Sequence, residues 1–427
     1  MRFLKSYLKY FFKVRIVGFA RMLLLVAFSP PPNRNEWEKR LLIVYLQAIG
    51  DAVMFTSVLK HYKNSFPDTR IYLLVQEGIG VKPVVNSFVD DVLTLDVRRF
   101  TTNPHYGYAR IAELKKIGFE TVLCHDHSPA EISGKFIAVS LGARSVVGYA
   151  GFGLALKQPF DVNMKRGIAY AKKHLDPRFT KIIPSIYENS ARKELAHVIF
   201  HYRAIYESFT GKKEIDYLTV LPANQNAASR VRALLEKNSV APRSFTILNV
   251  GSSTAWKNWP VDRFAEAASV LRDRNITAVL AGSSRERPLG EQFQKLYNGK
   301  CVNLIGETSI EELIELVRES ALVLTNDTST AHIAVALKKP SVCVIGTGLL
   351  GLVSLYGYRD INLWVHKDMS CVGDNWQCLA GANLSKPAPC IEAIEVSDVR
   401  EALDGLLKYT ASEKKIPREP FSISYLS

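Results

Sequence analysis

Short apolar runs alternate with helical periodicity in two successive series, and this alternation restricts the fold more than any other feature. LLIVYL opens the first series at Leu41, and FTILNVG opens the second at Phe245. Strands separated by helices form parallel sheets that are covered on both faces. The sequence therefore predicts an α/β protein with two Rossmann-like domains, whose parallel sheets face a central cleft.

Length and composition are consistent with two domains, because 427 residues with 47% hydrophobic content can fill two cores. We predict an N-terminal domain over residues 41–222 and a C-terminal domain over 223–400, followed by a helix end and tail over 401–427. Pro222 lies in a predicted linker. Residues 150–215 are less regular and are expected to elaborate the first domain.

The formal net charge of +14 indicates anionic partners, and half of it lies in residues 1–40, which carry nine basic and two acidic residues. Arg15 and Arg21 interrupt the apolar stretches of this segment. No uncharged window in it therefore approaches the ~20 residues that a membrane-spanning helix needs. We predict a basic amphipathic helix on an anionic inner-membrane surface. A signal peptide and a helix packed on the protein remain alternatives. The sequence is basic but has no nucleic-acid recognition motif, so no nucleic-acid partner is expected.

Three strand-to-helix junctions carry polar residues, and ligands of doubly wound sheets bind beyond such strand ends. The first junction is Gly50-Asp51, after the opening strand. Asp51 either caps the following helix or acts as a general base, and the local pattern alone favours the cap. Gly50 and Asp51 are placed on the acceptor side of the predicted cleft.

The second junction is NVGSSTAWKNWP, residues 249–260. Small residues allow a phosphate to approach backbone N–H groups, and Lys257 supplies a positive charge. The alternative is an ordinary polar loop with a solvated lysine. The GxxxxGK[ST] pattern of a P-loop is absent. The predicted diphosphate-binding residues here are Lys257, Gly251, Ser252, Ser253 and Thr254.

The third junction is TNDTSTAHIAVA, residues 325–336. Thr328 and Ser329 put consecutive hydroxyls at a helix N-terminus, which is a favourable anion site. Asp327 lies at the same strand end, and His332, one turn further on, is predicted to reach the same anion as these hydroxyls. A well-capped helix with a half-buried histidine is the competing interpretation.

Other patterns point less clearly to chemistry. His125 and His127 in CHDHS would share one face of a strand and are assigned to the acceptor pocket, since a metal site would need Asp126 on the same face. GTGLLG, residues 346–351, matches GxGxxG, but the next strand follows too soon for a dinucleotide-binding unit. Three cysteines lack a close CxxC pair, so no zinc is expected and their role stays open: Cys371, Cys378 and Cys390.

Together the three junctions resemble the family 9 glycosyltransferases, which include the ADP-heptose:lipopolysaccharide heptosyltransferases. The resemblance runs from about Leu41 to about Leu403 in order and spacing. It implies a GT-B fold, with the acceptor bound mainly by the first domain and the nucleotide-sugar by the second. It also implies an inverting transfer that needs no metal and no cofactor.

The resemblance assigns roles by position. Asp51 matches the catalytic aspartate and Lys257 the lysine that binds the donor diphosphate. Asp327, Thr328 and His332 match a DTGxxH-type motif at the phosphates and sugar. Glu286, in AGSSRERP, lies near the position of a ribose-binding acid, although this match is loose.

Three positions depart from the family pattern: Ser329 replaces the glycine of the DTG motif, Tyr45 a basic residue and Ser57 a proline. They argue against a standard inner-core heptosyltransferase and leave the sugar undefined. The sequence thus predicts a cytoplasmic, membrane-peripheral glycosyltransferase that acts on lipopolysaccharide or another lipid-linked glycan. A non-catalytic nucleotide-sugar-binding protein and a nucleotide-sugar epimerase of similar fold remain alternatives.

Overall fold

The computed structural model describes residues 39–126, 132–149, 173, 175–183, 197–213, 215–373, 376, 379, 383–412 and 422–423. The predicted membrane-surface segment therefore lies, apart from its last two residues, outside the described residues. No helix within the described ranges is long and apolar enough to cross a membrane.

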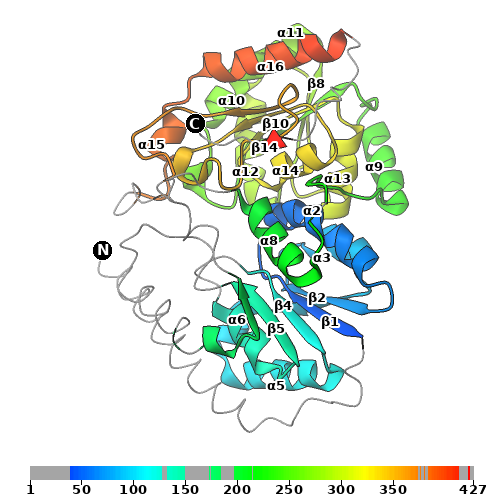
Figure 1. Ribbon diagram of the computed structural model, residues 1–427. Coiled ribbons are helices and arrows are strands. Elements are labelled where there is room, and N and C mark those ends of the chain that lie inside the picture. The colour runs from blue at the N-terminus through cyan, green and yellow to red at the C-terminus, as the bar shows by residue number, and fades with distance from the viewer. Residues whose placement is uncertain are drawn as a thin grey trace. The chain divides into compact units, whose positions relative to one another are not determined.

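The chain divides into two compact units. The first contains Met1–Ala52, Val58–Lys193 and Ile199–Asp216, and the second contains Val53–Ser57, Glu194–Val198 and Tyr217–Ser427. Each unit holds one six-stranded sheet whose neighbouring strands all pair in parallel (Figure 1). The predicted α/β class is thereby confirmed.

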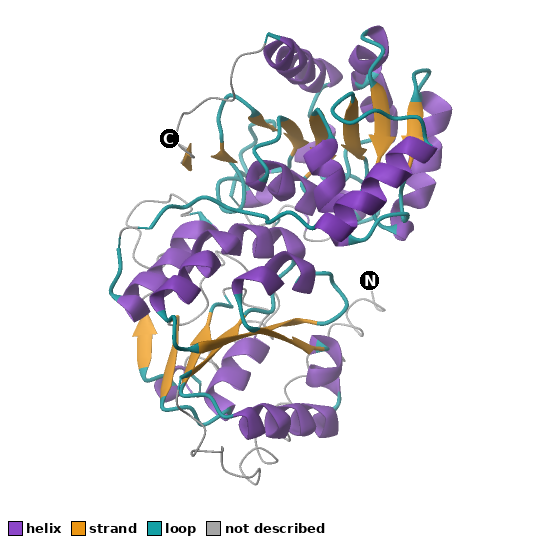
Figure 2. Cartoon of the chain, turned by 90° about the vertical axis from the view of Figure 1, so that its right-hand side faces the viewer, coloured by secondary structure: helices purple, strands orange, loops and turns teal. Residues whose placement is uncertain are grey.

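The first sheet has the order β3-β2-β1-β4-β5-β6. Strand β1 is RLLIV, and its last four residues are buried, as expected of a central parallel strand. Helices lie on both faces of the sheet (Figure 2). The elements are β1 (Arg40–Val44), α2 (Ile49–Ser65), β2 (Arg70–Gln76), α3 (Lys82–Val85), β3 (Asp91–Leu95), α4 (Val97–Thr102), α5 (Pro104–Ile117), β4 (Thr121–Cys124), α6 (Ile132–Ser140), β5 (Ser145–Tyr149), β6 (Lys181–Ile183) and α8 (Val198–Thr210).

The second sheet has the order β13-β11-β10-β7-β8-β9. Its elements are α9 (Gln225–Lys237), β7 (Phe245–Asn249), α10 (Val261–Ala267), α11 (Ser269–Asp273), β8 (Thr277–Leu280), α12 (Arg287–Leu296), β9 (Cys301–Asn303), α13 (Ile310–Glu319), β10 (Leu322–Asn326), α14 (Ser329–Ala336), β11 (Ser341–Val344), β13 (Asn362–Val365), α15 (Pro389–Glu392) and α16 (Val396–Ala411). A short antiparallel pair, β12 (Tyr356–Gly357) with β14 (Ser422–Ile423), lies outside this sheet.

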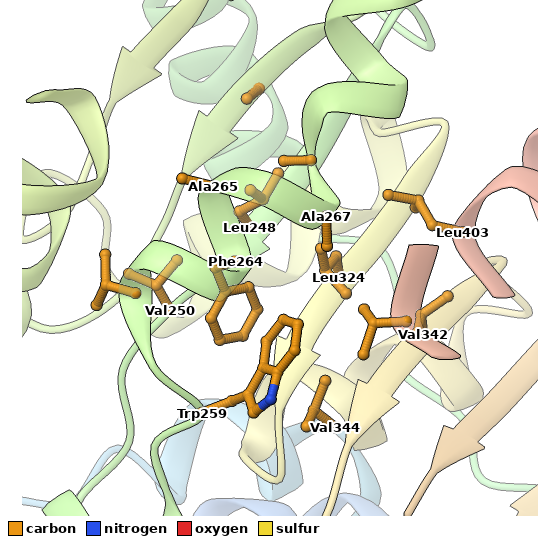
Figure 3. Close-up of a cluster of buried hydrophobic side chains, with 14 of the residues drawn as sticks. Leu248, Val250, Trp259, Phe264, Ala265, Ala267, Leu324, Val342, Val344 and Leu403 are labelled. Carbon is orange, nitrogen blue, oxygen red and sulfur yellow. The ribbon is translucent and has the colours of Figure 1, made fainter. Parts of the chain in front are cut away.

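A buried apolar cluster fixes α10 and α16 on the second sheet. Trp259 is fully buried there, and its indole Nε1 donates to the carbonyl of Ile394 at 3.1 Å. The ring of Phe264 meets the Trp259 indole edge-on, with centroids 5.1 Å apart (Figure 3). Burying two large aromatic side chains contributes several kcal/mol, roughly 1.5–3 for each on transfer from water. The loop before α10 is therefore held at a defined place on the sheet.

Candidate functional site

The strand order of the second sheet changes direction between β7 and β10, so the loops after these two strands diverge to opposite faces. Asn326, at the end of β10, ties the two loops together. Its Oδ1 accepts from the backbone N–H of Trp259 at 2.9 Å, and its Nδ2 donates to the carbonyl of Gly251 at 3.4 Å. The second and third sequence junctions are thus adjacent at one strand edge.

Lys257 and Asp327 form an ion pair at this edge, with Nζ to Oδ2 at 2.8 Å. The Asp327 side chain is 6% exposed and the Lys257 side chain 21% exposed. Burial alone would raise the pKa of Asp327, but the Lys257 ammonium outweighs it and holds that pKa below its ordinary value. Asp327 is therefore charged at neutral pH, and the ion pair holds the Lys257 side chain at this edge of the sheet.

Helix α14 begins directly after Asp327. Thr328 is its N-cap, and the Thr328 hydroxyl accepts from the N–H of Thr330 at 3.3 Å and pairs with the Thr325 hydroxyl at 3.1 Å. Ser329 is the first residue of the helix. The N-terminal turn therefore places the positive end of the helix dipole beside Lys257.

His332 is buried in the first turns of α14, and its Nδ1 lies 2.8 Å from the Tyr356 hydroxyl. Burial lowers the pKa of His332 to about 4; Lys257 adds to this lowering and Asp327 opposes it. The imidazole is thus neutral at neutral pH. It is available as a hydrogen-bonding group rather than as a second cation.

Glu286 lies beside the same loops. A Cβ added to Gly251 would lie 2.7 Å from Glu286 Oε1, and one added to Gly282 would lie 2.5 Å from Oε2. The carboxylate also accepts from the N–H of Ser283 in a capping box. Burial raises the pKa of Glu286, while the hydrogen bonds from Ser283 oppose the rise. Gly251 is therefore required for close approach of this acid, a role that its place in a predicted phosphate loop did not indicate.

Two tryptophans flank the lysine and were not predicted from the sequence. Lys257 Nζ lies 5.7 Å from the ring centroid of Trp256 and 5.9 Å from that of Trp376, and the two indoles meet edge-on at 4.4 Å. Such rings attract a cation and shield it from water. Trp376 is far from Lys257 in sequence, so no spacing motif could have found the pair.

The glycines of GTGLLG explain how Trp376 reaches this position. A Cβ on Gly346 or on Gly348 would lie 2.4 Å from atoms of the Trp376 indole. The loop therefore provides a flat backbone surface for an aromatic ring. The indole accounts for the first two glycines of the GxGxxG pattern, and the third, Gly351, has a positive φ of 79°; neither requires a dinucleotide.

In the first unit, Asp51 lies at the third position of α2, and Gly50 at the second. Ala48 is the N-cap, and no side chain caps the helix. The interpretation of Asp51 as the N-cap is therefore wrong, although a first-turn carboxylate still interacts favourably with the helix dipole. Burial, with Tyr202 and Asp51 as smaller causes, raises the pKa of the buried Tyr45 phenol well above its ordinary value.

Asp126 holds the loop that leads to Asp51. Its Oδ1 accepts from the N–H of Leu46 at 2.7 Å and from Gln47 Nε2 at 3.2 Å, all in buried surroundings. A Cβ on Gly134 of α6 would lie 1.8 Å from Asp126 Oδ2, so only glycine leaves room for this carboxylate. The sequence singled out the neighbouring histidines instead.

Strand β4 ends at Cys124, before the histidines whose shared strand face was predicted. His125 is fully buried, and its Nε2 lies 2.7 Å from the Tyr62 hydroxyl. This position packs His125 inside the first unit rather than on a surface open to an acceptor. His127 and Cys378 lie outside the described residues.

The remaining cysteines and possible metal ligands give no further site. Cys390 is buried beside Gly346, and the Cys371 thiol lies 4.0 Å from the Thr347 hydroxyl. Within the described part of the chain, no three His, Cys, Asp or Glu side chains are grouped so as to hold a metal ion. An open hollow of about 270 Å³ beside β12 and β13 contains none of the predicted site residues.

Two six-stranded parallel sheets with polar strand-end loops define an α/β protein of the GT-B class. Residues 173–377 match the family model of glycosyltransferase family 9 (heptosyltransferase). The chain is 29% identical over 137 residues to lipooligosaccharide heptosyltransferase 2 of Haemophilus influenzae, which covers 30% of this chain and 39% of that protein. The predicted resemblance is confirmed, because the chain is similar to family 9 heptosyltransferases.

Solved structures support the same fold. A family 9 glycosyltransferase from Veillonella parvula superposes with a TM-score of 0.66 at 16% identity, over 87% of this chain and 98% of that one. The ADP-heptose lipopolysaccharide heptosyltransferase II of E. coli gives a TM-score of 0.60 at 16% identity, over 87% and 99%. At these identities the likeness establishes the fold alone. The chain spans between 27% and 39% of the length of five curated relatives that it matches.

Proposed function

We propose that the protein is an inverting, metal-independent glycosyltransferase that moves a sugar from a nucleotide-sugar to lipopolysaccharide or another lipid-linked glycan. The observation that carries the proposal is the Lys257–Asp327 pair beside the N-terminus of α14, in a chain of family 9 likeness. The names of its relatives refer to heptose and to ADP-heptose, so heptose carried by ADP is the first donor to test.

The second unit supplies the groups that a departing nucleoside diphosphate needs. Cleavage of the bond between the anomeric carbon and the phosphate oxygen leaves negative charge on the diphosphate. The Lys257 ammonium and the N-terminal amides of α14 would stabilise that charge, with the loop of Gly251, Ser252, Ser253 and Thr254 contributing further donors. In this proposal Asp327 keeps Lys257 charged and oriented.

The first unit supplies the base. Asp51 would take the proton from the acceptor hydroxyl as that oxygen bonds to the anomeric carbon, which inverts the configuration in one displacement. Asp126 would keep the loop before Asp51 in place through Leu46 and Gln47. We also propose that the acceptor domain covers residues 41–222 and the nucleotide-sugar domain residues 223–400. The protein would act in the cytoplasm at the inner membrane.

The test has two stages. Sugars carried by ADP, UDP, GDP and CMP are screened for thermal stabilisation of the full chain, and the stabilising donor is then assayed for transfer to lipid-linked acceptors. Asp51→Asn is expected to lower turnover by about 10²–10⁴, the usual contribution of a general base. The exposed Asp68 offers a matched control, since Asp68→Asn makes the same chemical change in the same unit.

The outcomes separate the alternatives. Transfer that depends on Asp51 supports the proposal. Stabilisation by a nucleotide-sugar without any transfer identifies a binding protein instead. Unchanged turnover in Asp51→Asn removes Asp51 as the base.

A further inference from the structure

We infer that Tyr356 is a positioning residue whose hydroxyl donates to Nδ1 of His332 and thereby fixes the imidazole proton on Nε2, where it can be donated to an anionic group of the nucleotide. The inference rests on the proposed function for the identity of that anion. The tautomer itself can be measured without any activity.

The contact between the two side chains is buried and close. His332 is 5% exposed and Tyr356 is 3% exposed, and Nδ1 lies 2.8 Å from the phenol oxygen. The rings are stacked at an interplanar angle of 23°, with centroids 5.8 Å apart. Such burial strengthens the hydrogen bond and makes it costly to break.

Tyr356 is itself held from several sides. Its carbonyl accepts from the Trp364 indole Nε1 at 3.1 Å, and the two rings lie 5.8 Å apart. It also pairs with Ile423 in the antiparallel β12–β14 ladder. A phenol fixed in this way can fix its partner in turn.

Because His332 is neutral, its tautomer decides whether Nε2 donates or accepts a hydrogen bond. Because burial keeps the pKa of His332 at about 4, the imidazole carries one proton at neutral pH and has one donor and one acceptor nitrogen. Lys257, whose ammonium contributes to that pKa, and the N-terminus of α14 make the surroundings suited to an anion. An unprotonated Nε2 would direct a lone pair at the anion, whereas Nε2–H donates to it. Donation from Tyr356 to Nδ1 selects the second arrangement.

The experiment uses the full chain labelled with ¹⁵N-histidine and compares wild type with Tyr356→Phe at neutral pH. His332→Gln identifies the His332 resonances. The affinity for ADP is measured by calorimetry on the same samples. Tyr297→Phe is the matched control, because Tyr297 is also buried in the second unit, where it packs in the apolar cluster.

The expected result is a wild-type His332 with a pyrrole-type Nε2 and a pyridine-type Nδ1, and a mixture of tautomers in Tyr356→Phe. ADP binding should weaken roughly 2- to 10-fold in Tyr356→Phe, as for one lost net hydrogen bond, and stay unchanged in Tyr297→Phe. A wild-type proton on Nδ1, or an unchanged tautomer in Tyr356→Phe, overturns the inference. Absence of ADP binding in the wild type counts against the proposed function, while the tautomer still decides the role of Tyr356.

Discussion

Replacing Lys257 by methionine should destabilise the second unit in a way that depends on pH. Methionine keeps much of the length and apolar stem of lysine but removes the ammonium that donates to Asp327 Oδ2 at 2.8 Å. The carboxylate of Asp327, only 6% exposed, then lacks its main charge partner. Because Lys257 is itself partly exposed and water can enter, we expect a loss of about 1–3 kcal/mol in the free energy of unfolding at pH 7.

The pH dependence follows from the pKa of Asp327. In wild type this pKa lies below the ordinary value, so the pair stabilises the fold above about pH 4 and is lost on acidification. In Lys257→Met, burial is left to raise the pKa of Asp327 above its unfolded value. Stability is then lost when the carboxyl ionises, and the deficit relative to wild type should shrink as pH falls from 7 towards 4.

Urea unfolding followed by tryptophan fluorescence measures this effect, since four of the five tryptophans lie in the second unit. Asp327→Asn combined with Lys257→Met should recover most of the lost stability, because no buried charge remains. Equal stability of Lys257→Met and wild type at pH 7 would refute the reasoning. So would a deficit that widens on acidification.

Three further outcomes are expected. Gly348→Ala should displace the Trp376 indole, shift its fluorescence and weaken ADP binding, because the new Cβ would lie 2.4 Å from the ring. Gly405→Ala is the control and should bind ADP as wild type does, because its new Cβ would meet no atom within 4 Å. Asp126→Ala should speed amide hydrogen exchange at Leu46 and lower turnover. Asp126→Asn keeps an acceptor oxygen and should have a smaller effect on both, and equal exchange in the two variants would contradict the role of Asp126 in holding the loop. Lys339, whose pKa burial lowers to about 8, should make wild-type stability rise between pH 8 and 10, and Lys339→Met should lack that rise in urea unfolding.

Much of the fold follows from local periodicity. DAVMFTSVLKHYKNSF has the periodicity of an amphipathic helix and lies in α2, and the apolar run RIYLLVQ forms β2. The linker predicted at Pro222 leads directly into helix α9, whose start the sequence does not reveal. Asn224 resembles a turn residue but caps the helix by accepting from the Ala227 N–H. The segment PVDRFAEAASVLRDR has the periodicity of a single helix but forms two, α10 and α11, which meet at Ala268.

Site residues could be predicted from the sequence only where a single strand-to-helix loop contains recognisable polar or charged residues. Lys257 and Asp327 were found because each lies at a strand-to-helix junction, and they form an ion pair in the structure. Trp376 and Tyr356 were not predicted, because they lie in no sequence motif. Tertiary packing alone brings Trp376 next to Lys257 and Tyr356 next to His332. Contacts of this kind depend on packing between distant segments, which residue spacing does not encode.

The pairing of β12 with β14 has a practical consequence for anyone who produces the protein. Gly357 pairs with Ser422 and Tyr356 with Ile423, so the last described residues form the neighbouring strand of the tyrosine that contacts His332. A truncation that removes β14 would change the surroundings of Tyr356 without touching any predicted site residue. Preparations with different C-terminal ends should therefore not be compared in nucleotide affinity until β14 is known to be intact in each.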